Sequence, residues 1–120
     1  MRRGSTGWVC GVGGVMLLAG VAVARAGDKV TGEVVDMSCY LHHPETSTGN
    51  GHKKCAETCA KKGLPMGLLA DDGSVVLLLE DHANPKAYAD AIGKAADKIT
   101  VDGEKVTQGG LPGIVVEEVK

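Results

Sequence analysis

The sequence predicts a mainly β domain with one helix (α+β), built as a small five-stranded OB-like barrel, and three observations lead to this fold class. Short runs of β-branched and aliphatic residues recur after residue 27. One amphipathic helix falls between the third and fourth of these runs. The order of three strands, a helix and two strands is that of the OB-fold. An open antiparallel sheet with a helix across one face is the alternative.

The predicted strands are, in order, residues 30–36, 66–70, 74–80, 99–106 and 114–119. The first carries Gly32, where a strand that serves both sides of a barrel can bend. Asp-Gly at residues 72–73 is a good hairpin signal between the second and third strands. VDGEKV at 101–106 echoes VTGEVV at 30–35, which indicates two barrel strands with a similar bend.

The predicted helix covers residues 85–97, with Asn84 as N-cap and Pro85 at the first helical position. Small and apolar residues recur along it at helical spacing: Ala87, Tyr88, Ala91, Ile92, Ala95 and Ala96. This face is expected to pack against the sheet.

The first 26 residues are typical of a secretory signal peptide. Arg2 and Arg3 precede the uncharged, largely apolar stretch 8–24, and Ala24-Arg25-Ala26 offers small residues at a cleavage site. The mature chain is then a single domain, residues 27–120, in the periplasm or secreted medium. The alternative is an uncleaved membrane anchor, because the apolar stretch approaches the length that spans a bilayer.

The charge and composition of residues 27–120 narrow the classes of partner. All 15 acidic residues of the chain lie there, whereas Arg2, Arg3 and Arg25, three of its 13 basic residues, do not. Only Tyr40 and Tyr88 are aromatic in this part. An acidic surface with few rings argues against nucleic acid as a partner. No later run is long enough to span a membrane after signal cleavage.

The chemistry is expected in residues 37–65, a loop that is long for a compact domain and has no strand pattern. It contains every cysteine after residue 26 and three of the four histidines: Cys39, Cys55, Cys59, His42, His43 and His52. Residues 51–63 within it predict a short helix that stops at Gly63.

On that helix His52, Cys55 and Cys59 share one face, and Cys39 at the exit of the first strand can complete the set. Three thiols and an imidazole are standard tetrahedral ligands for Zn, and with Met37 or Met66 nearby they also suit Cu(I). The predicted function is therefore binding of a transition metal at a Cys3His site, for structure or for metal handling. The partner is the metal ion or an unknown exported protein.

Two other functions stay open. Exported thiols usually oxidise, so a disulfide between Cys39 and either Cys55 or Cys59 predicts a stapled binding module without metal. That pairing leaves one cysteine over. A thiol redox protein is the third possibility and the only enzymatic one, although Cys55 and Cys59 lack the usual C-x-x-C spacing. No haem is expected, because Ala60 follows Cys59 where C-x-x-C-H requires histidine.

Three motifs follow one another along the chain: TGEVVD at 31–36, then Cys39-Tyr40-Leu41, then Gly51-His52-x-x-Cys55-Ala56-x-x-Cys59 with Gly63-x-Pro65-x-Gly67 after it. In these motifs the chain resembles a group of small, uncharacterised exported bacterial domains over almost all of its mature length. The resemblance implies that Cys39, His52, Cys55 and Cys59 form one site. It implies no activity.

Overall fold

The structure is a computed structural model that describes residues 27–120. In chain order the elements are β1 (Asp28–Asp36), α1 (Met37–His42), the 3₁₀ turn η1 (Asn50–His52), α2 (Lys53–Lys61), β2 (Met66–Ala70), β3 (Val75–Glu80), α3 (Pro85–Ile92), β4 (Lys98–Gln108) and β5 (Leu111–Val119). The signal peptide predicted for residues 1–26 lies outside the described residues.

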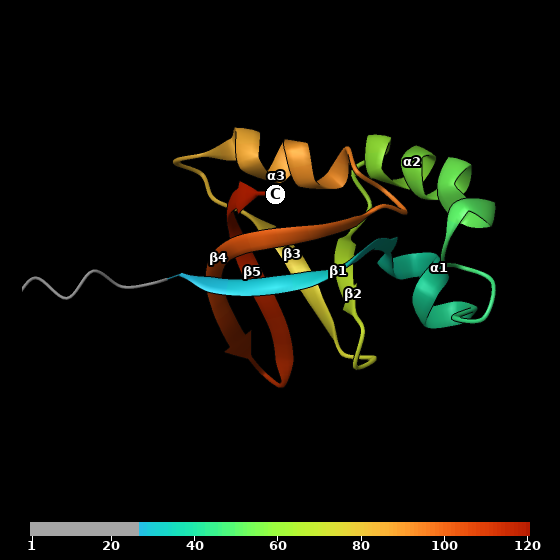
Figure 1. Cartoon of the computed structure of the whole chain (residues 1–120), viewed down its shortest axis with the longest axis horizontal. Coiled ribbons are helices and arrows are strands. Elements are labelled where there is room, and N and C mark those ends of the chain that lie inside the picture. The colour runs from blue at the N-terminus through green and yellow to red at the C-terminus, as the bar shows by residue number, and fades with distance from the viewer. Residues whose placement is uncertain (1–26) are drawn as a thin grey trace, which may run out of the picture.

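The five strands close into a barrel in the order β1-β2-β3-β5-β4 (Figure 1). β3 and β5 are parallel, and the other neighbouring pairs are antiparallel. Because β4 returns to pair with β1, the sheet has no free edge. The predicted five-stranded OB-like barrel is therefore confirmed, and the open sheet is wrong.

β1 serves both sides of the barrel. Its first half pairs with β4 and its second half with β2, and Gly32 pairs with both strands. A Cβ atom at Gly32 would collide with the backbone carbonyl of Leu69, so the crossing requires glycine. Gly103 of β4 sits at a bulge and faces the carbonyl of Val115 in the same way. The echoed V-x-G-E motifs thus mark two close backbone approaches.

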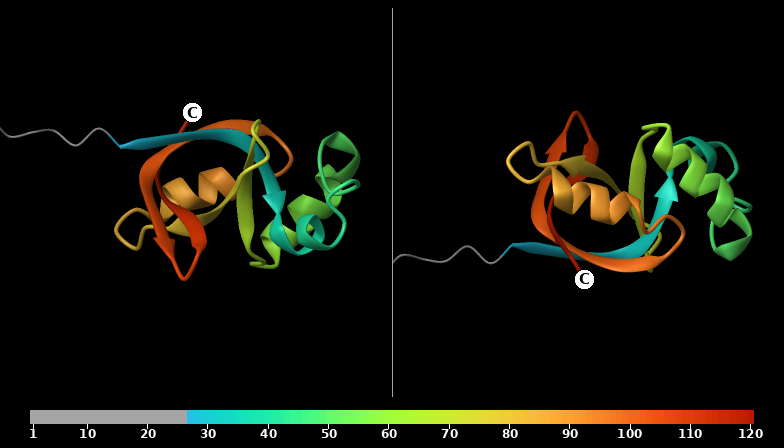
Figure 2. Two further views of the ribbon diagram at one scale, coloured as in Figure 1. Left: turned by 90° about the horizontal axis from the view of Figure 1, so that it is seen from below. Right: turned by 90° about the horizontal axis from the view of Figure 1, so that it is seen from above.

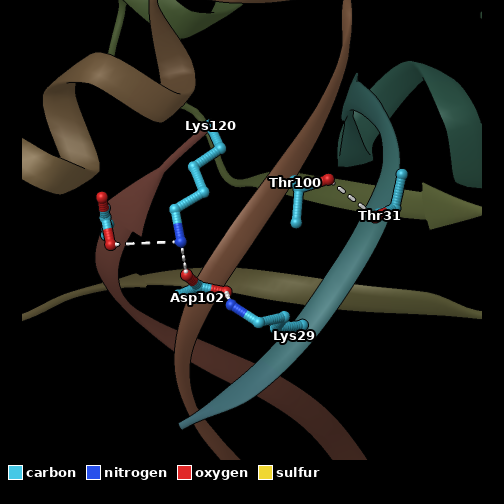
Figure 3. Close-up of polar contacts among 6 residues, drawn as sticks. Lys29, Thr31, Thr100, Asp102 and Lys120 are labelled. Atoms are coloured by element: carbon cyan, nitrogen blue, oxygen red, sulfur yellow. Dashed lines mark hydrogen bonds and ion pairs between the residues drawn. The ribbon is translucent and has the colours of Figure 1, made fainter.

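The register of β1 against β4 is supported by side-chain pairs on the outer face of the barrel (Figure 3). Thr31 and Thr100 stand opposite each other with their hydroxyl oxygens 2.8 Å apart. Lys29 donates to its cross-strand partner Asp102 over 2.5 Å, and Lys120 donates to the other oxygen of the same carboxylate. Cross-strand pairs of this kind stabilise a sheet locally.

The core consists of aliphatic side chains of the strands, closed at one end of the barrel by the alanine face of α3 (Figure 2). Fully buried strand residues include Val34, Leu68, Val101, Ile114 and Val116. Ala87 and Ala91 of α3 are also buried, as is Ala95 just beyond it. The small side chains of this face let the helix approach the strands closely.

The helix is shorter than predicted: α3 ends at Ile92, and residues 93–97 form a turn. Here the backbone leaves the helix to pair with β1, since Ala96 N–H donates to Val34 O and Val34 N–H donates to Asp97 O. Asn84 precedes Pro85 as predicted, but its side chain does not cap the helix. It donates to the carbonyl of Glu117 instead, which ties the start of α3 to β5.

Candidate metal centre

Residues 37–65 form a segment beside the barrel, at the ends of β1 and β2, which we call the insert (Figures 1 and 2). It has no strand, as predicted, but it contains a helix that the sequence did not predict, α1. Asp36, the last residue of β1, starts that helix: its Oδ1 accepts a hydrogen bond of 2.9 Å from the Cys39 N–H. Aspartate is a preferred N-cap because it satisfies a free N–H of the first turn. The cap places Cys39 beside a fully buried carboxylate.

The chain returns to this carboxylate through η1. Glu33 of β1 accepts a hydrogen bond from Gly49 N–H, and Gly49 has a φ of 71°, which favours glycine. The turn that follows brings His52 Nε2 to 3.1 Å from Asp36 Oδ2. An ionised carboxylate only accepts hydrogen bonds, so without metal Nε2 carries the hydrogen, and His52 binds an ion through Nδ1 or after Nε2 gives up this hydrogen. The His52 side chain is 13% exposed.

α2 is attached to the barrel on one face and open on another. Ala56 and Ala60 are buried in the core. Lys53 donates to the carbonyl of Ala95 over 3.3 Å and to the carboxylate of Asp97 over 2.8 Å. Cys55 lies on the exposed side. The helix is thus held by groups that take no part in the cysteine-histidine cluster.

Four side chains from β1, α1, η1 and α2 converge. Within residues 27–120, the ligand atoms of Asp36, Cys39, His52 and Cys55 all lie within 4.8 Å of one another. The cluster grades from buried to open: Asp36 is buried, Cys39 and His52 are partly exposed, and Cys55 is exposed. One carboxylate, one imidazole and two thiols at these distances could hold a metal ion. We call these four residues the Asp36 cluster.

The electrostatics of the Asp36 cluster combine the negative charge of Asp36 with a raised pKa of the Cys39 thiol. Burial tends to raise the pKa of Asp36, but hydrogen bonds from the Cys39 N–H and from His52 outweigh it and lower the pKa. The Asp36 carboxylate in turn raises the pKa of the Cys39 thiol to about 12, with help from burial and from Cys55. An incoming cation therefore meets the Asp36 carboxylate and displaces the proton of the Cys39 thiol as it binds.

Cys59, the fourth predicted ligand, is not one of the Asp36 cluster. It lies one turn after Cys55 on α2 and is partly exposed. Burial raises the pKa of its thiol, and the charge of Asp36 and the neighbouring Cys55 raise it further. Of the four predicted ligands, the structure thus gathers Cys39, His52 and Cys55 around Asp36, and Cys59 lies beside the Cys39 and Cys55 thiols but outside the group of ligand atoms within 4.8 Å of one another.

The remaining soft or nitrogen donors lie outside the Asp36 cluster. His42 and His43 are exposed at the end of α1, with ring centroids 6.0 Å apart. Met66 is buried in the barrel core, and the Met37 sulfur packs against Gly67. Both methionines are explained by packing.

Asp36 is the residue that sequence reasoning missed. The sequence correctly predicts Asp36 as the last residue of the first strand, but this prediction gave it no role in the site. A signal was nevertheless present, because an aspartate three residues before a cysteine is spaced to cap a helix that starts between them. Once that helix is recognised, the carboxylate and the thiol must be neighbours.

Comparisons of the chain with protein-family models, with curated proteins and with solved structures found no match. Among residues 27–120, no helix has the length and apolar character needed to cross a bilayer. Within residues 27–120 the Asp36 cluster is therefore the feature that points to a function.

Proposed function

We propose that this protein is an exported domain that binds a transition metal ion at the Asp36 cluster and handles it for transfer. Cys39, His52 and Cys55 supply one imidazole and two thiolates, and Asp36 supplies the fourth group. The observation that carries the proposal is the convergence of four ligand atoms within 4.8 Å of one another.

The donor set favours zinc over copper. Zinc accepts sulfur, nitrogen and carboxylate oxygen together in a tetrahedral site, whereas Cu(I) prefers thiolate and thioether sulfur. The two methionines that would have favoured Cu(I), Met37 and Met66, are engaged in packing. Zinc is therefore the first metal to test, and Cu(I) is the second, with Cys59 as its additional sulfur.

Two features support metal handling over a purely structural site. The insert is held by contacts that need no metal, such as those from Glu33 to Gly49 and from Lys53 to Ala95 and Asp97. Cys55 also leaves one side of the cluster open to solvent. An ion that is reached from one side and is not required for folding can be exchanged with another ligand.

Export is part of the proposal and is supported by the signal-peptide pattern of residues 1–26. The expected mature chain begins at Gly27. Intact mass of protein recovered from the periplasm or medium measures this directly, and a mass that includes residues 1–26 would favour a membrane anchor.

The binding experiment is a zinc titration of the reduced protein against a chromophoric chelator. We expect one equivalent of zinc to bind, and His52→Ala to weaken the affinity at least about tenfold, because a direct ligand is lost. The matched control is His82→Ala, since His82 lies in the loop before α3 and outside the Asp36 cluster. Equal affinities of the two variants, or no binding at all, would overturn the proposal.

A second candidate is the disulfide-stapled binding module without metal. One observation favours it: the sulfur atoms of Cys39 and Cys55 belong to the same group of atoms within 4.8 Å. The His52→Ala variant separates the two candidates, because a disulfide has no need of an imidazole.

A further inference from the structure

We infer that Cys39 and Cys55 form a reversible disulfide that excludes the metal, so that the Asp36 cluster exists either as a reduced metal site or as an oxidised, metal-free one. The reduced, metal-bound state of this inference rests on the proposed function. The disulfide itself depends only on the positions of the two cysteines.

The geometry favours a bond between α1 and α2 over one within α2, and of the two α2 cysteines beside Cys39, Cys55 is the more exposed. The sulfurs of Cys39 and Cys55 lie within 4.8 Å of each other and come from different elements, α1 and α2, joined by residues 43–52. Rotation of the side chains and small shifts of this connection can bring them to the bonded distance of about 2.05 Å. Cys55 and Cys59 are four apart on α2, where Cβ atoms are about 5–6 Å apart, whereas a disulfide needs about 3.5–4.5 Å.

Exposure decides which thiol reacts first. Cys55 is exposed and Cys39 is partly exposed, so a small disulfide such as oxidised glutathione reaches Cys55. The Cys55 sulfur attacks one glutathione sulfur, which forms a mixed disulfide and releases the first reduced glutathione. The Cys39 sulfur then attacks the Cys55 sulfur and releases the second. Two protein thiols are oxidised, one glutathione disulfide is reduced, and the two thiol protons leave on the two glutathione molecules.

The disulfide and the metal exclude each other because they use the same two sulfurs. Oxidation leaves only Asp36 and His52 as donors in the Asp36 cluster, which are too few for a four-coordinate zinc site. A bound ion in turn holds both thiolates and shields them from the oxidant. Cys59 keeps a free thiol in either state and gives the experiment an internal reference.

The experiment incubates the protein, purified after export and fully reduced, with oxidised glutathione in the presence of either zinc or a chelator. Free thiols are then alkylated and the peptides are mapped by mass spectrometry. Without metal we expect a Cys39–Cys55 crosslink that dithiothreitol reverses, with Cys59 still alkylated. With one equivalent of zinc we expect crosslinking to slow at least tenfold. The variant Cys59→Ser should behave like the wild type, whereas Cys39→Ser should form no intramolecular crosslink.

Three results would overturn the inference or its premise, and they are distinguishable. A crosslink that contains Cys59, or none at all without metal, overturns the disulfide. Crosslinking that is equally fast with and without zinc, in protein shown by chelator titration to bind zinc, overturns the mutual exclusion. Failure to bind zinc in that titration removes the proposed function, and with it the exclusion, even where the crosslink forms.

Discussion

The barrel and the insert are built on different principles. The barrel is a continuous hydrogen-bonded sheet around aliphatic side chains, and Asp36 is the one charged residue of its strands that is buried. The insert buries Ala56 and Ala60 in that core and Met37 against Gly67, and its remaining order comes from short helices and polar ties. All thiols of residues 27–120 lie in the insert. Stability and chemistry are thus separated in the chain.

The two regions meet at Asp36. This residue belongs to β1, whose pairing with β2 fixes it, and it also caps α1 and contacts His52. The cluster is therefore positioned by the barrel although most of its ligands come from the insert. This arrangement predicts that changes in the barrel act on stability, that changes in the insert act on metal binding, and that Asp36 affects both.

The largest expected effect is on stability, from truncating a core residue of the barrel. Leu68→Ala should lower the free energy of unfolding by about 2–5 kcal/mol, because Leu68 is fully buried and a cavity would remain. The matched control is Leu41→Ala on α1, where Leu41 is 70% exposed and the change should stay within about 0.5 kcal/mol. Urea denaturation of the metal-free protein measures both. Comparable losses would mean that the insert carries stability as the barrel does.

The next effect is on metal affinity, from removing an insert thiol. Cys55→Ser should weaken zinc binding by more than about 100-fold, a loss beyond that expected for residues that only support ligands. Its effect on the metal-free fold should be small, because Cys55 is exposed. Cys59→Ser is the matched control one turn away, and we expect it to change zinc affinity less than tenfold. A reversed order would make Cys59 the second sulfur in place of Cys55, and equally large losses in both variants would restore the predicted Cys3His site.

The barrel could be predicted because its signals are local and periodic. Each β-branched run indicates a strand, and the Asp-Gly pair indicates a hairpin. The glycines of the two V-x-G-E motifs indicate where one strand backbone approaches another closely. Closure through β1 followed from the order of elements. The end of α3 could not be predicted, because it is set by the pairing of the turn after Ile92 with Val34, a contact far along the chain.

The candidate site could be predicted only in part. Residue type and helical spacing identified Cys39, His52 and Cys55 as neighbours, and the structure places them together. Asp36 escaped because its role depends on α1, a helix of six residues without an amphipathic pattern. The position of Cys59 outside the Asp36 cluster depends on the rotation of α2 about its axis, which the packing of Ala56 and Ala60 fixes. Spacing alone does not contain that information.

Asp36→Asn tests the junction between the two regions. Asparagine caps helices about as well as aspartate, so α1 should persist. The carboxylate is lost, however, whether it binds the ion or orients His52, and zinc affinity should fall by about 10–100-fold. Helix content by circular dichroism and the chelator titration measure the two effects. Loss of helix content together with affinity would show that the residue acts through folding alone.

The smallest expected effect concerns Asp102, a second carboxylate with a lowered pKa, on the outer face of the barrel (Figure 3). Hydrogen bonds from Lys120 and then Lys29 lower its pKa from the ordinary value of 3.8. A lowered pKa stabilises the fold above the ordinary value, and this contribution is lost as the pH falls through the folded-state value. Asp102→Asn should therefore lower the melting temperature slightly at pH 7 and not in acid.

Salt separates this carboxylate from Asp36. At an ionic strength of 1 M the screening length falls to about 3 Å, so the difference between wild type and Asp102→Asn at pH 7 should shrink. The Asp36 contribution should persist in salt, because that carboxylate is fully buried and bonded to a backbone N–H. The comparison uses thermal melts of both asparagine variants without metal. Each variant is measured at pH 7 and in acid, and in low and high salt. If the melting temperature of Asp102→Asn stays below that of the wild type in both acid and high salt, the Asp102 side chain acts through packing and not through its charge.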